Sequence, residues 1–282
     1  MKILTFDIEE WFHLLDRESP ESISRWNSYE VRIHKNMERI FAMLYLHNFS
    51  ATFFCLGWVA ETYPEIIREI TSRGYEVGSH SMMHQAVYDQ NPKTFKGDVE
   101  QSIKLLEDIT GQKVRYFRAP LFSINENTKW AFEILKELGI DVDCSIFPAP
   151  HTDGGYASYA APVPSVIQYN GIELKELPVN SKNVFGKSII FSGGGYFRLL
   201  PYPIIQRWSK DSDYVMTYFH PRDFDPEQPK MNGLTTMKKF RSYFGLRGSV
   251  DKFNRFLDDF EFIDCKTAID RIDWSSVPKV SL

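Results

Sequence analysis

The sequence is poor in cysteine. Its 282 residues include three cysteines, which lie far apart at Cys55, Cys144 and Cys265. An odd number of widely spaced cysteines argues against a disulfide framework, and the sequence has no Cys-x-x-Cys pair. We therefore expect three reduced thiols, as in a cytosolic protein.

Long apolar runs are missing as well. No stretch approaches the roughly 20 apolar residues that cross a bilayer. The apolar run at the start, residues 3–6, is far too short for the core of a secretory signal peptide, and acidic residues follow it at once. From this we expect a cytoplasmic protein with no transmembrane segment, which meets its substrate inside the cell.

Neither sign of charge is in excess. The chain carries 33 Lys and Arg against 37 Asp and Glu, a formal net charge of -4. This balance gives no global attraction to nucleic acid or to anionic lipid, so we expect no nucleic-acid partner. The glycine-rich stretch 192–198 is expected to form a turn, and it lacks the Gly-Lys-Ser/Thr ending of a phosphate-binding loop. The sequence shows no internal repeat, low-complexity tract or linker, and its length suits one large α/β domain. It does not reveal the oligomeric state.

What the sequence does contain is an alternation of short β-rich runs and helical stripes. Helices are expected to end near Asn48, Gly74, Gly111 and Gly139. The expected strands cover residues 3–6, 51–56, 75–78, 114–117, 140–142, 172–177 and 214–219. Such alternation is typical of parallel βαβ units, in an open sheet or in a barrel. Residues 147–166 are expected to form a long loop over the sheet that could face a substrate.

A polar cluster follows five of these strands, at the strand ends where α/β folds place their sites. His80 and His84, four residues apart, are expected on one side of a helical turn, where both could bind one divalent metal with an acidic third ligand. Each cluster alone has an ordinary explanation, such as a surface acid, an ion-pair partner or a buried structural histidine. Together the five are hard to place anywhere except around one cleft.

The five clusters, in chain order, are Thr5-Phe6-Asp7, His80-Ser81-Met82-Met83-His84, Arg118-Ala119-Pro120, Asp143-Cys144-Ser145 and Phe219-His220-Pro221. As a set they resemble the motifs of the polysaccharide deacetylases of carbohydrate esterase family four. The resemblance implies a distorted (β/α) barrel of about seven strands with a metal at its C-terminal mouth. It implies one catalytic domain over residues 1–282, with the motifs within 5–221 and a helical packing extension over 222–282.

The resemblance also implies a role for each matched residue. In most members of the family the first motif contains two adjacent aspartates, of which the first is a base and the second a metal ligand. This chain has Asp7-Ile8-Glu9 instead. In an extended segment positions 7 and 9 point to the same side, so Asp7 is expected as base and Glu9 as ligand. Glu10 is the alternative ligand if the strand ends earlier. His80 and His84 would complete the site, with zinc as the expected metal and cobalt or nickel as alternatives.

The remaining roles follow the chemistry of amide hydrolysis. The metal would polarise an N-acetyl carbonyl and acidify water, and Asp7 would take the proton. The backbone N–H of Leu121 would help to stabilise the oxyanion, although relatives often have an aromatic residue there. His220 would protonate the leaving amine. Arg118 and Asp143 would fix the base and the acid.

We therefore expect a metal-dependent N-deacetylase acting on an amino-sugar unit of a glycan or of a nucleotide- or lipid-linked precursor. Residues 193–201 and 243–249 further resemble a subgroup associated with bacterial exopolysaccharide and surface-glycan synthesis. Two alternatives stay open. One is a hydrolase of the same fold that acts on a non-sugar amide such as a ureide or a formamide. The other is a non-catalytic glycan-binding relative.

Overall fold

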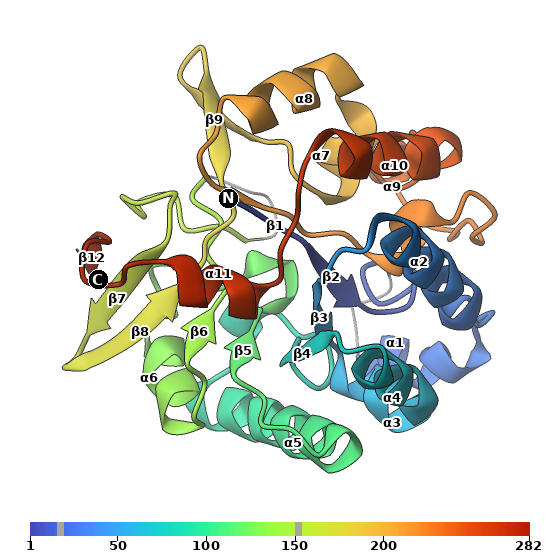
Figure 1. The fold of residues 1–282 in the computed structure, drawn as a ribbon. Helices are drawn as coiled ribbons and strands as arrows, with labels where there is room; N and C mark the ends of the chain where they lie inside the picture. Colours follow the sequence, from blue (N-terminus) through green and yellow to red (C-terminus); the bar gives the residue numbers. More distant parts are fainter. Residues whose placement is uncertain (16–19, 150–153) are drawn as a thin grey trace.

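A mostly parallel β-sheet forms the frame of the computed structural model, which describes residues 1–15, 20–149 and 154–282 (Figure 1). Eight strands are hydrogen-bonded in the order β12-β7-β8-β6-β5-β4-β3-β2. Neighbours are parallel except for β7 and β8, which form an antiparallel hairpin. The strands are β2 (Thr5–Ile8), β3 (Thr52–Cys55), β4 (Glu76–Ser79), β5 (Tyr116–Phe117), β6 (Val142–Asp143), β7 (Ser165–Tyr169), β8 (Ile172–Glu176) and β12 (Lys279–Ser281).

A separate pair of strands bends this sheet toward a barrel. β1 (Lys2–Ile3) leads into β2 and pairs in parallel with β11 (Val215–Met216). A bridge between Phe6 and Phe219 continues the contact. On the other side, the side-chain carbonyl of Asn180, just beyond β8, accepts a backbone N–H of β11 at 3.2 Å. The parallel strands thus curve round to meet their starting point, partly through side chains. The predicted α/β fold with a distorted barrel is confirmed.

Helices pack around the outside of this frame (Figure 1). Asn48 ends α2 and Gly111 ends α5, both in the left-handed conformation that stops a helix, as predicted. No helix of the described residues combines the length and apolar content needed to cross a bilayer. The helices are α1 (Pro20–Arg25), α2 (Ile33–His47), α3 (Gly57–Thr62), α4 (Pro64–Ser72), α5 (Pro92–Thr110), α6 (Trp130–Glu137), α7 (Gly194–Leu199), α8 (Tyr202–Lys210), α9 (Thr236–Tyr243), α10 (Ser249–Asp259) and α11 (Cys265–Arg271).

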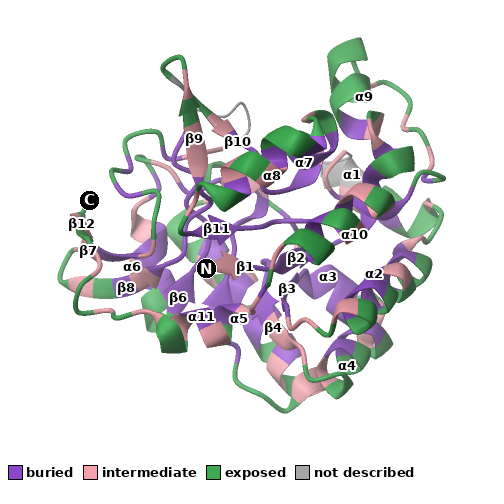
Figure 2. Ribbon diagram, turned by 45° about the horizontal axis from the view of Figure 1, so that its top comes forward, coloured by how far each residue is buried: buried purple, intermediate pink, exposed green. Residues whose placement is uncertain are grey.

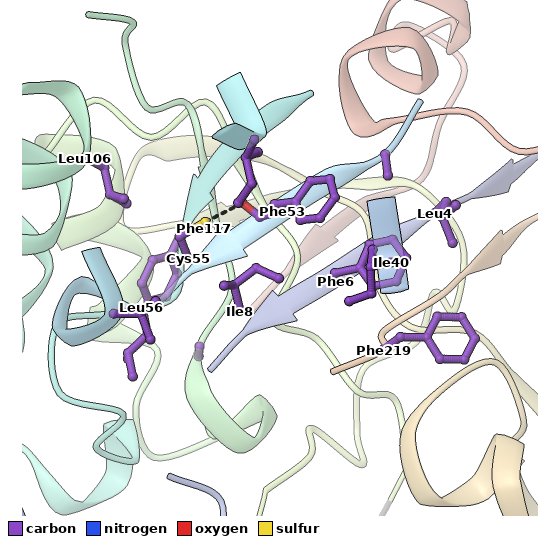
Figure 3. Packing of buried hydrophobic residues seen from close by; sticks show 14 of the residues in the cluster. Leu4, Phe6, Ile8, Ile40, Phe53, Cys55, Leu56, Leu106, Phe117 and Phe219 are labelled. Carbon is purple, nitrogen blue, oxygen red and sulfur yellow. Dashed lines mark hydrogen bonds between the residues drawn. The ribbon is translucent and has the colours of Figure 1, made fainter. Parts of the chain in front are cut away.

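Phenylalanines dominate the core between the sheet and these helices. Figure 3 shows Phe6, Phe53 and Phe219 beside the aliphatic side chains of neighbouring strands and helices. Phe6 stacks on Phe53 with ring centroids 5.2 Å apart, and Phe219 meets Phe253 of α10 edge to face at 4.8 Å. In β2 and β3 every residue is buried, as expected for parallel strands covered on both faces. In Figure 2 the buried residues fill the middle of the molecule and the exposed ones lie on the outer helix faces.

Two local predictions were wrong. His80 and His84 do not lie on a helical turn, because the chain leaves β4 as a loop in which Ser81 and His84 have positive φ angles of 67° and 54°. The glycine-rich stretch 192–198 is not simply a turn, because α7 begins at Gly194. Gly193 is required there: a Cβ atom at this position would lie 2.0 Å from the Tyr218 carbonyl oxygen.

Other segments were predicted incompletely. A hairpin of β9 (Ser181–Val184) and β10 (Lys187–Ile190) follows the main sheet and was not predicted. Of the long loop expected over 147–166, residues 150–153 lie outside the described residues, and the last two belong to β7. The predicted C-terminal extension contains α9, α10 and α11, but its last strand, β12, joins the main sheet beside β7.

Candidate metal centre and active site

Three buried side chains from two separate parts of the sequence meet at the carboxyl ends of β2 and β4. One ligand atom from each of Glu9, His80 and His84 lies within 4.8 Å of the other two. Glu9 follows β2 directly, and His80 follows β4, which is two strands away in the sheet. A carboxylate and two imidazoles are a common ligand set for zinc. These three residues could therefore hold one divalent cation.

The free lone pairs of these residues fit a cation. Neither carboxylate oxygen of Glu9 has a hydrogen-bond partner among the described residues. Glu9 Oε2 lies 2.7 Å from His84 Nε2, but the angles are not those of a hydrogen bond. His80 Nδ1 lies 2.8 Å from the Arg118 carbonyl oxygen, which can only accept. The hydrogen is therefore on Nδ1, and Nε2 keeps a lone pair for a metal.

Burial and nearby charges favour the protonation states in which Glu9 and His80 can bind a metal. Burial, helped by the charge of His84, lowers the pKa of His80 to about 4, so its imidazole is neutral near pH 7. Burial would raise the pKa of Glu9, but the three nearby histidines His84, His220 and His80 outweigh it and hold that pKa below its ordinary value. Metal binding needs a carboxylate at Glu9 and a neutral imidazole at His80, and these are the states that the two shifts favour.

Contacts from two helices hold the loop that carries the histidines. The N–H groups of Gly57 and Trp58, at the start of α3, donate to the carbonyl oxygens of Ser81 and Met82 at 2.8 and 2.9 Å. From α5, the carboxylate of Asp98 accepts the N–H groups of Met82 and Met83 at 2.8 and 3.1 Å. Asp98 was not identified from the sequence. It fixes the loop geometry that the helical prediction missed.

Glu10, the alternative ligand, points elsewhere. Its Oε1 accepts the N–H groups of Arg32 and Ile33 at 2.7 and 2.9 Å, at the start of α2, and its Oε2 accepts the Trp11 N–H at 3.3 Å. Glu10 therefore caps a helix, and Glu9 is the residue that joins the two histidines. His13, another residue of this segment, is fully buried against Phe12 and accepts the Glu10 N–H through Nδ1.

Asp7 lies beside this cluster and is held by Arg118. Arg118 is fully buried, and its Nη1 donates to Asp7 Oδ1 and to Thr5 Oγ1, each at 2.7 Å. The second oxygen, Oδ2, lies 3.8 Å from His220 Nε2. Glu9 Oε1 lies 3.9 Å from the same nitrogen, so Asp7 and Glu9 reach the same place, as their alternation along an extended segment predicts.

His220 is held by Asp223. Asp223 Oδ2 lies 3.1 Å from His220 Nδ1, and Arg198 Nε donates to Asp223 Oδ1 at 3.0 Å. Burial lowers the pKa of His220, but the hydrogen bond and charge of Asp223 outweigh it, with help from Glu9 and Asp7, and raise the pKa to about 9. His220 is therefore an imidazolium near pH 7, the form that can donate a proton.

Asp143 does not hold His220, contrary to the expectation that it fixes the acid. Its carboxylate accepts the N–H and the hydroxyl of Ser145 at 3.2 and 2.5 Å, and the Ser145 hydroxyl accepts the Ala119 N–H at 2.8 Å. Asp143 thus fixes the backbone that leads to Leu121. Leu121 lies in a short 3₁₀ turn with a left-handed backbone, φ 60°, and its role as an oxyanion donor stays a prediction.

The fold and the site geometry agree with sequence comparison. Residues 4–142 match the sequence profile described as "Polysaccharide deacetylase". This part of the chain is therefore similar to the polysaccharide deacetylase family. Residues 144–270 match a second profile, described as a domain of unknown function, DUF3473.

Individual relatives agree with this family. The chain is 32% identical over 96 residues to the peptidoglycan-N-acetylglucosamine deacetylase of Bacillus cereus, an alignment that covers 34% of this chain and 35% of the relative. It is 36% identical over 75 residues to the chitooligosaccharide deacetylase of Azorhizobium caulinodans, covering 26% and 36%. The chain thus spans about a third of the length of these two deacetylases.

Solved structures are similar to this fold along the whole length of the chain. A candidate polysaccharide deacetylase from Mycobacterium smegmatis superposes with a TM-score of 0.65 at 18% identity, covering 100% of this chain and 92% of the other. A pseudoenzyme of carbohydrate esterase family four from Bacillus anthracis superposes with a TM-score of 0.51 at 13% identity, covering 100% and 69%. At such identities the likeness concerns the fold alone.

Proposed function

We propose that the protein is a metal-dependent hydrolase that removes the N-acetyl group from an amino-sugar unit of a glycan or glycan precursor. The observation that carries this proposal is that a possible metal-ligand set, a possible base and a possible acid lie together in one place. The orphaned carboxylate of Glu9 faces two histidines, while Asp7 and His220 lie side by side next to it. A ligand set with an adjacent base and acid suits hydrolysis of an amide, which needs both.

Glu9, His80 and His84 would hold the cation, and zinc suits a site of one carboxylate and two imidazoles. A cation bound there supplies Lewis-acid polarisation of the amide carbonyl and acidification of water. Asp7, positioned by Arg118, accepts the proton of the attacking water. His220, charged and positioned by Asp223, donates a proton to the amine nitrogen as the carbon–nitrogen bond breaks. The products are acetate and the free amino sugar. The Leu121 N–H is the proposed donor to the oxyanion.

The substrate class rests on the family and on the relatives. The two deacetylases described above are named for peptidoglycan N-acetylglucosamine and for chitooligosaccharide. We extend this to an N-acetylated sugar within a bacterial surface-glycan precursor carried by a nucleotide or a lipid. The cytoplasmic location stays a prediction that cell fractionation of the native protein can test.

Acetate release is the direct test. The purified protein, loaded in turn with zinc, cobalt and nickel, would be incubated with N-acetylated sugar nucleotides, chitooligosaccharides, peptidoglycan fragments, a cyclic ureide and a formamide. We expect acetate only from N-acetylated sugars, and none from a His80→Ala variant. Turnover of the ureide or the formamide alone would overturn the sugar substrate. Glycan binding without acetate release in the metal-loaded protein would show a pseudoenzyme.

A further inference from the structure

One surface segment has a charge that contrasts with the rest of the chain. Residues 230–247 contain five basic residues and no acidic one, although the whole chain has a formal net charge of -4. All five are exposed, and three of them belong to α9; they are Lys230, Lys238, Lys239, Arg241 and Arg247. Positive charge is therefore concentrated on one part of the molecule.

The same segment exposes large apolar side chains. Met237, Phe240 and Phe244 are 60%, 46% and 46% exposed. Met237 and Phe240 are three residues apart and so lie on one side of α9, and Phe244 follows directly after the end of the helix. The rings of Phe240 and Phe244 lie 4.8 Å apart, so they form a continuous apolar surface. Leu199 of α7, the helix that contacts α9, is also 45% exposed.

The helix that carries these residues projects from the body of the protein (Figure 2). Every residue from Thr236 to Arg241 is exposed, and Ser242 is the buried residue of the helix. A projecting helix with apolar side chains between basic ones can enter the headgroup region of a bilayer.

We propose that Met237 and Phe240 of α9 and Phe244 just beyond it, with the basic residues around them, dock the protein on an anionic phospholipid surface. Phenylalanines partition into the boundary between headgroups and acyl chains, while lysine and arginine remain beside the phosphates. Basic residues next to a surface of anionic lipid each add to the attraction, which salt screens. An acidic protein with an apolar pocket is the alternative occupant, and the experiment below distinguishes it from a lipid surface.

The docking surface is connected to the proposed acid. Arg198 of α7 donates to the carbonyl oxygens of Arg241, Ser242 and Phe244 at the end of α9. The same guanidinium donates to Asp223, which holds His220. If the chain is a deacetylase, as proposed above, this arrangement brings a lipid-linked glycan toward the side of the site that protonates the amine.

Vesicle binding tests the proposal without any need for turnover. The metal-loaded full chain would be sedimented with vesicles of equal parts phosphatidylglycerol and phosphatidylcholine, and with phosphatidylcholine vesicles alone. We expect binding to the anionic vesicles that weakens as salt is added. A Met237→Ser/Phe240→Ser variant should bind about tenfold more weakly or worse. A Lys239→Gln/Arg241→Gln variant should lose a similar factor, and should lose the preference for anionic lipid.

The hairpin of β9 and β10 provides a matched control, because Phe185 at its tip is fully exposed but lies outside α9. A Phe185→Ser variant should bind like the wild type, and the thermal melting of all variants should confirm that they are folded. Failure of the folded wild type to bind anionic vesicles would overturn the proposal. So would binding that the α9 variants leave unchanged, or retention by an acidic polypeptide without binding to vesicles.

Discussion

Asp223 Oδ2 contacts His220 twice: it lies 3.1 Å from the imidazole Nδ1 and accepts the backbone N–H of the same residue at 3.0 Å. The two contacts fix both the ring and the chain at His220. The carboxylate is itself held by Arg198, and its pKa is lowered to about 2, because the His220 hydrogen bond and the nearby arginines outweigh burial. Asp223 is therefore an anion at any pH at which the proposed acid works.

The first prediction concerns this pair. Asp223→Asn keeps the shape of the side chain but removes the charge that stabilises the imidazolium, so kcat should fall about 100-fold, the scale of a general acid's contribution. KM should change little, because Asp223 is not proposed to touch substrate. Steady-state kinetics of acetate release would measure both, and Asp223→Glu should recover part of kcat.

Asp225 offers a matched control for that variant. It is equally buried and lies two residues away, but it pairs with Arg32 and not with His220. Asp225→Asn should lower thermal stability and leave kcat near the wild-type value. An equal loss of kcat in the two variants would mean that Asp223 acts through the fold alone.

The second prediction separates the two glutamates. Glu9→Gln should weaken metal binding more than about 100-fold, because even the outer partners of metal ligands are worth 10- to 100-fold. Glu10→Gln should keep the metal and cost about 1–2 kcal/mol of stability, since it weakens the cap of α2. Metal content after dialysis against a weak chelator would decide. Full retention in Glu9→Gln, together with loss in Glu10→Gln, would reverse the assignment.

Much of this site could be predicted from the sequence, because it depends on local rules. Parallel strands bring their carboxyl ends to one edge, which is why Glu9 and His80 meet although they lie far apart in the chain. Side chains alternate along an extended segment, so Asp7 and Glu9 were expected to point to the same side of it. Helix ends at Asn48 and Gly111 followed from the residue types that tolerate left-handed backbone.

The rest depended on contacts that local patterns do not contain. The spacing of His80 and His84 suits a helix, but Asp98 of α5 holds their segment as a loop from a distance in sequence. Asp143 lies at the carboxyl end of a strand, where site residues are expected, yet its carboxylate accepts hydrogen bonds from Ser145 and not from His220. Asp223 did leave a signal: it stands three residues after His220, the spacing of a capping box. That signal was missed because histidine is an unusual first member.

The third prediction concerns the base. Asp7→Asn should abolish turnover and still bind metal, because Asp7 is proposed as base and Glu9, His80 and His84 as the ligands. The variant leaves the buried charge of Arg118 without its carboxylate partner, so stability should fall by about 3–5 kcal/mol. Metal analysis and acetate release on the same folded sample would test it, with His84→Ala as the variant expected to lose metal. Loss of metal from Asp7→Asn would make Asp7 a ligand.

The fourth prediction concerns a buried pair of carboxyl groups behind the site. Glu176 is fully buried against Asp143, and its Oε2 has no hydrogen-bond partner among the described residues. Burial, and then the charge of Asp143, raise the pKa of Glu176 well above its ordinary 4.5. When Glu176 is protonated, its Oε2 can donate a hydrogen bond to the carboxylate of Asp143, and the pair carries a single negative charge.

This proton has a consequence for stability. Above pH 4.5 the unfolded chain releases the proton of Glu176 while the folded chain keeps it, so the folded state binds more protons and stability falls as pH rises. The side chain of Glu176→Gln has no proton to lose, so the unfolding free energy of this variant should rise relative to the wild type by up to about 1.4 kcal/mol per pH unit above pH 4.5.

Urea denaturation across pH 4 to 9 would measure the unfolding free energies of both proteins. Subtracting one from the other cancels the contributions of all other titrating groups. Glu173→Gln, on the exposed part of the same strand, is the control and should show no such gain. A difference between wild type and Glu176→Gln that stays constant with pH would mean that Glu176 is ionised in the folded protein.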